Sequence, residues 1–390
     1  DENKKSVLGI QKSTFDFEEN IWRINPADNT ENKVVFDVVK KEFKFSPFHL
    51  KSNEQEIAFE GVVRDSTYKD LKIDFVKVKL ASFLPPIDSL SLNGRLNGNL
   101  NFIQKEGLYS PEGDLSISNF KINSFEHGHL DLRVKGVNSY EKYAVELMLR
   151  NAGNNSIYAK GYVDFSSQRP TLDLNLHLHK FKLNAFSPLG KDVLTKLRGE
   201  VSTEKDSIKV TGFLRNPVME GELKLENAGL KFPYLNVDYD FEGRTKIRLE
   251  NQSFIFEDLT LVDTKHKTRG DFKGSITHQD FKHWSLDLNV DTDNLLVLDT
   301  EEREEVLYYG TAFINGNARI TGLTSRLSID VNARTNSGTL FVIPLSDLKT
   351  VDNYQLIHFN TEKNTTNKKD EIVLNALKGD HKRSNCRNCN

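Results

Sequence analysis

The segment Leu223-Lys-Leu-Glu-Asn-Ala-Gly-Leu230 has the apolar spacing from which the fold of this chain can be predicted. Its apolar residues lie at offsets n, n+2, n+5 and n+7. A strand places residues n and n+2 on one face, whereas a helix does not. The same offsets recur at Phe43/Phe45/Phe48/Leu50, Ile73/Phe75/Val78/Leu80, Leu115/Ile117/Phe120/Ile122, Leu176/Leu178/Phe181/Leu183 and Phe254/Phe256/Leu259/Leu261.

The offset of five in this pattern, reached by a three-residue step from n+2, breaks strict alternation by one residue. A β-bulge or a sharp bend absorbs one residue and returns the next side chains to the same face. The pattern therefore predicts long, bent strands with one apolar and one polar face. The alternative is two short strands joined by a turn.

Composition favours a one-sided sheet and excludes some partners. The chain has 390 residues, of which 37% are hydrophobic, and this modest fraction suits a sheet with one polar face. The 53 basic and 56 acidic residues give a net charge of -3. This balance predicts no nucleic-acid partner and provides no polybasic arm for an anionic membrane.

The sequence contains no segment with the character of a signal peptide or a membrane-spanning helix. Asp1-Glu-Asn-Lys-Lys5 is polar, and Leu295-Leu-Val-Leu298 is among the longest apolar runs, whereas a span needs about 20 residues. We therefore expect either a cytosolic protein or an internal piece of a longer exported one.

Strands separated by short polar turns are predicted from the beginning of the chain. They cover 14–17, 20–24, 34–38, 43–50, 56–63 and 71–80. Short strands at this spacing without long helices indicate an all-β fold with mostly antiparallel neighbours.

A coarse internal repeat is centred on three glycines. Leu96-Asn-Gly98, Leu197-Arg-Gly199 and Ile314-Asn-Gly316 each precede another strand-like segment. The sequence thus predicts one repeating sheet segment over 1–360, with repeats beginning near 94, 197 and 314. Residues 361–390 are polar and are expected to be a disordered or truncated tail.

One short helix is expected near 187–197. Ser187 is placed as its N-cap, Pro188 as its first residue, and Leu189, Val193, Leu194 and Leu197 have helix-like spacing.

Candidate catalytic and metal-binding residues are few, and each has a simpler explanation. His177 and His179 lack a third ligand nearby, as do His127 and His129, so solvent-side histidines are expected. Glu301, Glu302, Glu304 and Glu305 fit a solvated surface, and Cys386/Cys389 form one isolated C-x-x-C pair. Motifs for acyl or phosphoryl transfer and for dinucleotide binding are missing. We therefore predict no enzymatic activity, no metal site and no cofactor.

The apolar face is the remaining candidate site. If the sheet curves strongly, this face forms an open groove that needs a ligand or a partner, since a large exposed apolar surface is otherwise unfavourable. The residues predicted to line the groove are Ile73, Phe75, Val78, Leu115, Ile117, Phe120, Leu176, Leu178, Phe181, Leu223, Leu225, Leu230, Phe254, Phe256, Leu259, Trp284, Leu286 and Leu288.

An ordered set of segments resembles the TamB family of the AsmA-like superfamily, in its Bacteroidetes form. The set consists of Ile24–Asn29, Asp65–Leu71, Phe186–Gly190, Ala228–Phe241, Leu259–Thr264, Leu296–Thr300, Tyr308–Gly322 and Gly338–Asp347. The resemblance extends from about residue 20 to 360. This sequence departs from the family pattern because it lacks the N-terminal anchor and the extreme C-terminal part, and we therefore expect an internal fragment.

The resemblance implies a periplasmic protein anchored in the inner membrane, with a taco-like β-groove. It also implies an outer-membrane partner of the Omp85 type, similar to TamA, and a role in outer-membrane biogenesis. The expected function is non-enzymatic transfer of phospholipid between the two membranes, with acyl chains on the apolar residues.

Two other functions remain open from the sequence. The same groove is suited to guiding the strands of nascent outer-membrane barrel proteins to their insertase, as a scaffold or chaperone in protein secretion. A closed β-sandwich array on the cell surface would instead fill its apolar face with a second sheet.

Overall fold

The computed structural model describes residues 5–17, 20–26, 32–82, 91–151, 154–190, 195–204, 206–243, 245–279, 283–302, 307–344 and 374–375. These residues are almost entirely β, with two short 3₁₀ helices, and the strands described below pair with antiparallel neighbours. The predicted all-β fold is confirmed.

The chain divides into two compact units, and the division falls within one strand. Unit 1 comprises Asp1–Ala228 with Leu249–Gln252, and unit 2 comprises Gly229–Arg248 with Ser253–Asn390.

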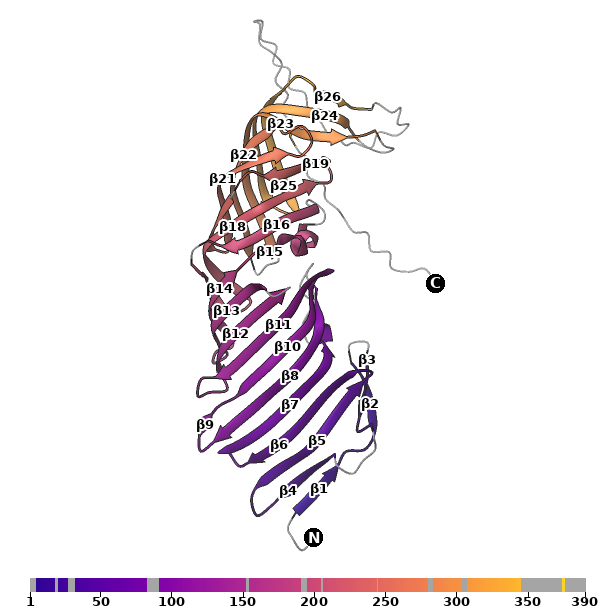
Figure 1. The fold of residues 1–390 in the computed structure, drawn as a ribbon, viewed down its shortest axis with the longest axis vertical. Coiled ribbons are helices and arrows are strands. Elements are labelled where there is room, and N and C mark those ends of the chain that lie inside the picture. The colour runs from indigo at the N-terminus through magenta and orange to yellow at the C-terminus, as the bar shows by residue number, and fades with distance from the viewer. Residues whose placement is uncertain are drawn as a thin grey trace, which may run out of the picture. The chain divides into compact units, whose positions relative to one another are not determined.

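Unit 1 begins with short strands and continues as a regular meander (Figure 1). Its elements are β1 (Lys5–Gly9), β2 (Ser13–Phe17), β3 (Asn20–Ile24), β4 (Lys33–Asp37), β5 (Glu42–Ser52), β6 (Gln55–Arg64), β7 (Tyr68–Lys79), η1 (Leu80–Ser82), β8 (Leu92–Lys105), β9 (Leu108–Tyr109), β10 (Glu112–Ile122), β11 (Phe125–Gly136), β12 (Lys142–Asn151), β13 (Asn154–Asp164), β14 (Thr171–Leu178), β15 (Phe181–Lys182), η2 (Leu183–Gly190), β16 (Thr195–Thr203) and β17 (Ile208–Phe213). The strand β18 (Asn216–Phe232) contains the division between the units.

Strand order in unit 1 departs from chain order near its beginning, where β1 pairs with β4 and β3 with β5, and again after β14. β6, β7, β8, β10, β11, β12, β13 and β14 pair successively, and β14 then pairs with β17. β15 pairs with β16, and β16 also pairs with β18. The six strands predicted over the first 80 residues are confirmed within a few residues at each end.

Unit 2 contains β19 (Val237–Phe241), β20 (Thr245–Asn251, whose last residues belong to unit 1), β21 (Ser253–Asp263), β22 (Arg269–Gln279), β23 (His283–Thr300), β24 (Tyr309–Leu323), β25 (Arg326–Thr335), β26 (Leu340–Val342) and β27 (Leu374–Asn375). β21 to β25 pair in chain order, and β26 lies beside the beginning of β24. β27 pairs with two residues of β25, so the predicted tail at 361–390 contains a short strand.

The predicted bulges occur at the step from n+2 to n+5. Register shifts fall between Phe45/Phe48, Phe75/Val78, Ile117/Phe120 and Phe256/Leu259. At two of these steps, the residue before the apolar side chain has a left-handed backbone, with φ of 51° at Lys77 and 52° at Asn119. β18 is continuous through Leu223–Leu230, with Asn227 at φ 50°.

Leu176–Leu183 follows the alternative instead of a bulge. β14 ends at Leu178, Lys180 takes a left-handed φ of 47°, and β15 begins at Phe181. Two short strands joined by a turn therefore carry this copy of the pattern.

Glycines lie across from the bends. Gly98 of β8 pairs with Phe75 and with Leu115, and its φ is 121°. A Cβ at Gly98 would collide with the carbonyl oxygen of Asp114 on the next strand. A side chain is thus excluded where adjacent strands approach most closely.

The helix predicted near 187–197 is wrong in position and type. The helical segment is the 3₁₀ helix η2, which begins at Leu183, and residues 195–197 belong to strand β16. Ser187 is not an N-cap, because its hydroxyl donates to the Leu197 carbonyl at 3.3 Å. Residues 191–194 lie outside the described part of the chain.

Candidate functional site: an apolar sheet face

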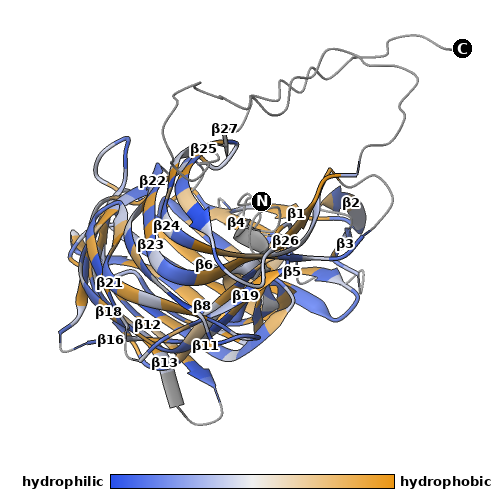
Figure 2. Cartoon of the chain, turned by 90° about the horizontal axis from the view of Figure 1, so that it is seen from above, coloured by the Kyte–Doolittle hydropathy of each residue, from blue (hydrophilic) through white to orange (hydrophobic). Residues whose placement is uncertain are grey.

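Apolar side chains alternate with polar ones along the strands, as the hydropathy colours of Figure 2 show. Residues directly opposite each other on neighbouring antiparallel strands share a face. The registers of unit 1 therefore reveal which side chains form continuous rows across the sheet.

Three apolar rows cross unit 1 on one face of the sheet. The central row is Ile57, Phe75, Gly98, Leu115, Leu132, Leu147, Ala159, Leu176 and Ile208. One flanking row is Phe59, Ile73, Leu100, Gly113, Val134, Val145, Gly161, Leu174 and Val210. The other, beyond the bulges, is Val78, Leu96, Ile117, Leu130, Leu149, Ile157 and Leu178. Together these rows are called the apolar face below.

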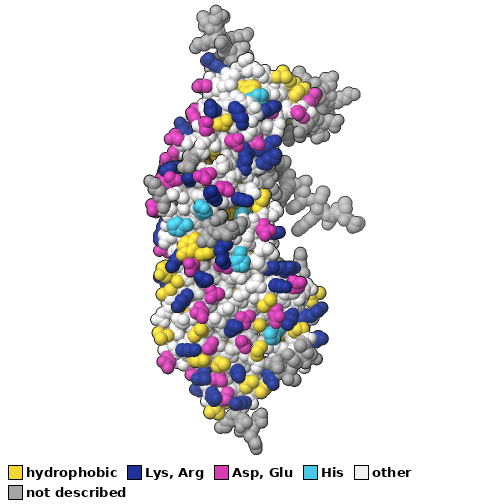
Figure 3. Space-filling model, viewed as in Figure 1, with side chains coloured by type: hydrophobic (Ala, Val, Ile, Leu, Met, Phe, Trp, Pro, Cys, Tyr) yellow, Lys and Arg dark blue, Asp and Glu magenta, His cyan; other side chains and the backbone are white. Residues whose placement is uncertain are grey.

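The opposite face of the same strands is polar throughout its central row. Asp74, Asn99, Asp114, Arg133, Glu146, Lys160, Asn175 and Lys209 follow one another across the sheet. Acidic and basic side chains are interspersed over the surface seen in Figure 3. Of the two faces, only the polar one is therefore suited to contact with water.

The apolar face is covered unevenly. In the central row Phe75, Leu115, Leu132, Leu147 and Leu176 are only half-buried. In the row beyond the bulges, by contrast, Val78 and Leu149 are fully buried. Inner-face side chains of a closed sandwich contact a second sheet. The half-buried central row still exposes apolar surface.

Seven of the predicted lining residues lie in these rows: Ile73, Phe75, Val78, Leu115, Ile117, Leu176 and Leu178. Phe120 lies beyond the bulge opposite Gly128. Phe181 is buried and stacks on the His127 ring at 4.9 Å. Leu223 and Leu225 are buried in β18. The role of all of these residues as groove lining stays a prediction.

The predicted lining residues of unit 2 lie in different surroundings. Leu259 belongs to a buried core cluster, and Leu230 and Phe256 pack against it. Phe254 stacks on Trp284 at 6.3 Å, opposite Ile276, which also pairs with Leu286. Leu288 is buried opposite Gly274.

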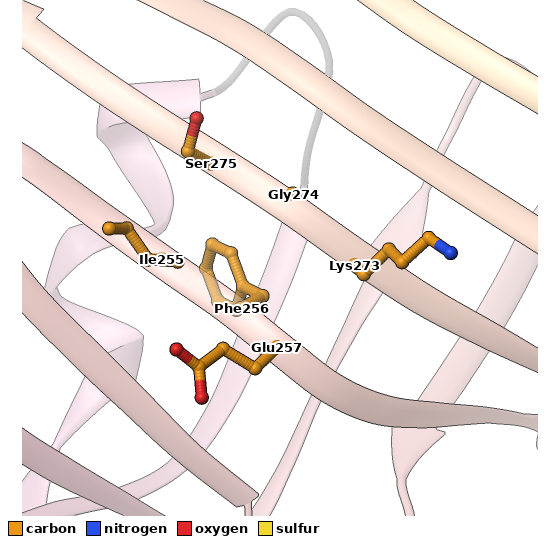
Figure 4. A pocket seen from close by; sticks show the side chains of 6 residues that line it. All are labelled: Ile255, Phe256, Glu257, Lys273, Gly274 and Ser275. Carbon is orange, nitrogen blue, oxygen red and sulfur yellow. The ribbon is translucent and has the colours of Figure 1, made fainter.

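A shallow depression opens at the unit 2 bulge. Ile255, Phe256 and Glu257 of β21 and Lys273, Gly274 and Ser275 of β22 line it (Figure 4). The Phe256 ring meets Phe272 edge-on at 5.4 Å. Pairing with a glycine leaves this ring without a side chain opposite it, which accounts for the depression.

The candidate histidines do not form a metal site. His177 is exposed and lies 6.3 Å from the Tyr158 ring, and His179 follows the end of β14. His127 is buried, and its pKa is lowered by burial and by the charge of Lys182. His129 lies 2.9 Å from Asp131. Among the described residues, His, Cys, Asp and Glu do not gather in threes at metal-binding distance.

The remaining candidate groups are surface or undescribed positions. Glu301 and Glu302 are exposed, whereas Glu304 and Glu305 lie outside the described residues, as do Cys386 and Cys389. Within the described part of the chain, helices of a length and apolarity that could cross a membrane do not occur.

Sequence reasoning missed the central leucines of the apolar face. Leu132 and Leu147 were not predicted to line a groove, although Leu130/Leu132/Val134 and Val145/Leu147/Leu149 alternate strictly. These strands lack the three-residue step from n+2 to n+5 that marks the other apolar strands. Simple period-two alternation is the signal that would have found them.

This architecture defines an antiparallel sheet protein with one apolar and one charged face. Residues 257–383 match the family model of the TamB C-terminal domain, so this part of the chain is TamB-like. The match reaches beyond residue 360, where the resemblance seen in the sequence ended. Comparison with curated proteins and with solved structures gave no match.

TamB-family proteins are periplasmic, anchored in the inner membrane, and non-enzymatic components of transport and assembly. They work with a TamA partner in outer-membrane assembly. The match thus indicates a TamB-family role in outer-membrane biogenesis for this chain.

Proposed function

We propose that the apolar face of unit 1 holds the acyl chains of phospholipid on their way between the inner and outer membranes. The supporting observation is the continuity of the apolar rows across the sheet: two rows cross nine paired strands from β6 to β17, and the third crosses seven from β7 to β14. A row of neighbouring half-buried aliphatic side chains offers contact to a long methylene chain without any specific polar group.

The mechanism is passive. Removing apolar surface from water contributes about 25 cal/mol per Å², so an acyl chain gains similar free energy at any point along the rows. Since successive strands continue the same apolar rows, with leucines at Leu115, Leu132 and Leu147, a chain can shift from one strand to the next and stay on apolar side chains. Headgroups stay at the wet edge of the sheet.

Lipid extraction from the purified protein tests this function. Leu176 of β14 lies between Ala159 and Ile208 on the apolar face, whereas its neighbour Asn175 lies on the polar face between Lys160 and Lys209. Leu176→Asp is expected to remain folded and to lose most of its co-purified phospholipid. Asn175→Asp introduces the same carboxylate beside two lysines and is the matched control.

Mass spectrometry of the extracts and circular dichroism of the same preparations provide the measurements. Equal phospholipid content in the two variants would overturn the proposal. Bound barrel-protein segments without lipid would instead support a scaffold or chaperone for barrel insertion. A wild-type protein that binds neither would indicate a closed array.

A further inference from the structure

One edge of the apolar face carries a polar cluster of a different kind. It lies at the strand ends joined by the turns that follow β6, β8 and β11. The cluster, called the rim cluster below, consists of Lys69, Gln104, Tyr109 and Tyr140. β9, at whose end Tyr109 lies, is labelled in Figure 1.

The registers place the rim cluster on the apolar side of the sheet. Lys69 pairs with Gln104, and Gln104 pairs with Tyr109, so the three share a face. Lys69 precedes Leu71 and Ile73 by two and four residues in β7, and alternation puts all three on one side. A lysine thus continues a line of side chains that is otherwise apolar.

Aromatic rings hold Lys69 at this edge. Its Nζ lies 5.4 Å from the centroid of the Tyr140 ring, within the range of a cation–π interaction. Tyr109 meets Tyr140 edge-on at 4.7 Å, and the Tyr143 hydroxyl donates to the Tyr140 carbonyl at 2.8 Å. The ammonium group is therefore positioned by packing against rings.

The rim cluster has unused polar capacity. Lys69 is half-buried and forms no ion pair with a carboxylate of the described residues. Gln104 is only 2% exposed; its Nε2 donates to the Ser66 carbonyl at 2.8 Å, but its Oε1 has no partner among the described residues. The buried Tyr140 hydroxyl also has no hydrogen-bond partner among the described residues.

A buried acceptor without a partner costs about 1 to 3 kcal/mol, so native proteins usually satisfy such groups. Burial and the neighbouring Tyr109 and Tyr143 raise the pKa of Tyr140, which keeps its hydroxyl protonated as a donor. A cation, a neutral donor and a buried acceptor thus meet beside apolar rows.

We propose that the rim cluster binds the phosphate headgroup of a glycerophospholipid whose acyl chains lie on the apolar face. Lys69 contacts the phosphate as a cation, and the Tyr140 ring positions it. The Tyr140 hydroxyl is a second donor to the phosphate, and Gln104 Oε1 accepts from a headgroup hydroxyl or amine. This inference rests on the proposed function, because the same face supplies the acyl-chain contacts.

A second lysine provides a matched control. Lys142 lies 5.3 Å from the centroid of the Tyr162 ring, with nearly the same cation–π geometry. Lys142 pairs with Asp164, and Tyr162 pairs with Asp173. Lys142 and Tyr162 therefore lie on the polar face of the sheet, the same face as Glu146. Lys69→Gln and Lys142→Gln therefore remove equal charges from equal ring contacts on opposite faces.

The experiment compares two fluorescent lipids with identical acyl chains, a phosphatidylglycerol and a diacylglycerol, binding to the full chain. Wild-type protein is expected to bind the phospholipid more tightly. Lys69→Gln should weaken phospholipid binding by about tenfold, the ratio expected when a charge-assisted hydrogen bond is lost. Diacylglycerol binding should be unchanged, and Tyr140→Phe should give a smaller effect in the same direction.

The outcomes separate this inference from the function on which it rests. If wild-type protein binds neither lipid, the proposed function fails and the inference fails with it. If both lipids bind and Lys69→Gln leaves their ratio unchanged, the headgroup site is overturned while the function survives. An equal loss in Lys142→Gln would indicate general surface charge, and inorganic phosphate binding as tightly as phospholipid would indicate an unrelated anion site; either result overturns the inference.

Discussion

The two units use the same strand pattern but cover their apolar residues differently. In unit 1 the central row of the apolar face is half-buried along most of its length. In unit 2 Val237, Tyr239, Leu259, Leu261, Leu295, Leu296 and Phe313 form a buried cluster, against which further apolar side chains pack. Alternating strands therefore produce either an accessible apolar face or a closed core.

The difference arises from a contact between two strands of unit 2, β19 and β23, that are not paired with each other. In unit 2 the short strand β19 pairs with both β18 and β21 and places Tyr239 near β23, where its hydroxyl donates to the Leu296 carbonyl at 2.6 Å. This bond satisfies the one polar group of a side chain that is otherwise surrounded by apolar residues. The leucines of the central row in unit 1 remain half-buried.

The largest expected effect comes from introducing a carboxylate into each region. Leu295 is 1% exposed in the unit 2 core, so Leu295→Asp should lower the free energy of unfolding by at least about 3 kcal/mol. Leu176→Asp on the half-buried face can keep its carboxylate hydrated and should cost much less. Urea denaturation of both variants measures the difference, and equal losses would show that unit 1 also has a closed core.

A smaller effect is expected at the bends of unit 1. Gly98→Ala places a Cβ against the Asp114 carbonyl and forces alanine into φ of 121°, which should cost about 1 to 3 kcal/mol. Gly9→Ala is the control, because its Cβ would meet no atom within 4 Å. Thermal unfolding compares the two, and a Gly98→Ala variant as stable as the control would mean that the strands can separate at the bend.

The smallest effect concerns alkaline pH and unit 2. Burial, with a contribution from Asp263, raises the pKa of Tyr239 in the folded state. As the pH rises, the Tyr239 hydroxyl therefore loses its proton in the unfolded chain before it does so in the folded protein. The contribution of this hydroxyl to the free energy of unfolding should be present below about pH 10 and decrease above it. Tyr239→Phe should be about 1 kcal/mol less stable at pH 7 because the bond to Leu296 is lost.

Denaturation between pH 8 and pH 11 checks this linkage. The difference between wild type and Tyr239→Phe should narrow as pH rises, because only the wild type has the titrating hydroxyl. A constant difference over this range would show that Tyr239 ionises equally in both states.

The sequence alone determined the strands, their alternating faces and four of the bulges. These properties are local, because side chains alternate at every residue of a strand and one extra residue restores the phase wherever it is inserted. The same local rules failed at 187–197, where helix-like spacing of leucines was outweighed by pairing of the residues from 195 onward in strand β16.

Only the tertiary structure decided which side chains become neighbours and how far they are covered. β14 pairs with β17 and not with β15 or β16, the next strands in the chain, and this pairing places Leu176 opposite Ile208. The local spacing of residues does not specify that partner. The pairing of β7, β8 and β9 brings Lys69 to Tyr109, and Tyr140 packs on Tyr109, so Lys69 and Tyr140 meet although 71 positions separate them in the sequence. The physical reason is that register and coverage depend on contacts between distant segments, whereas alternation depends only on the backbone of each strand.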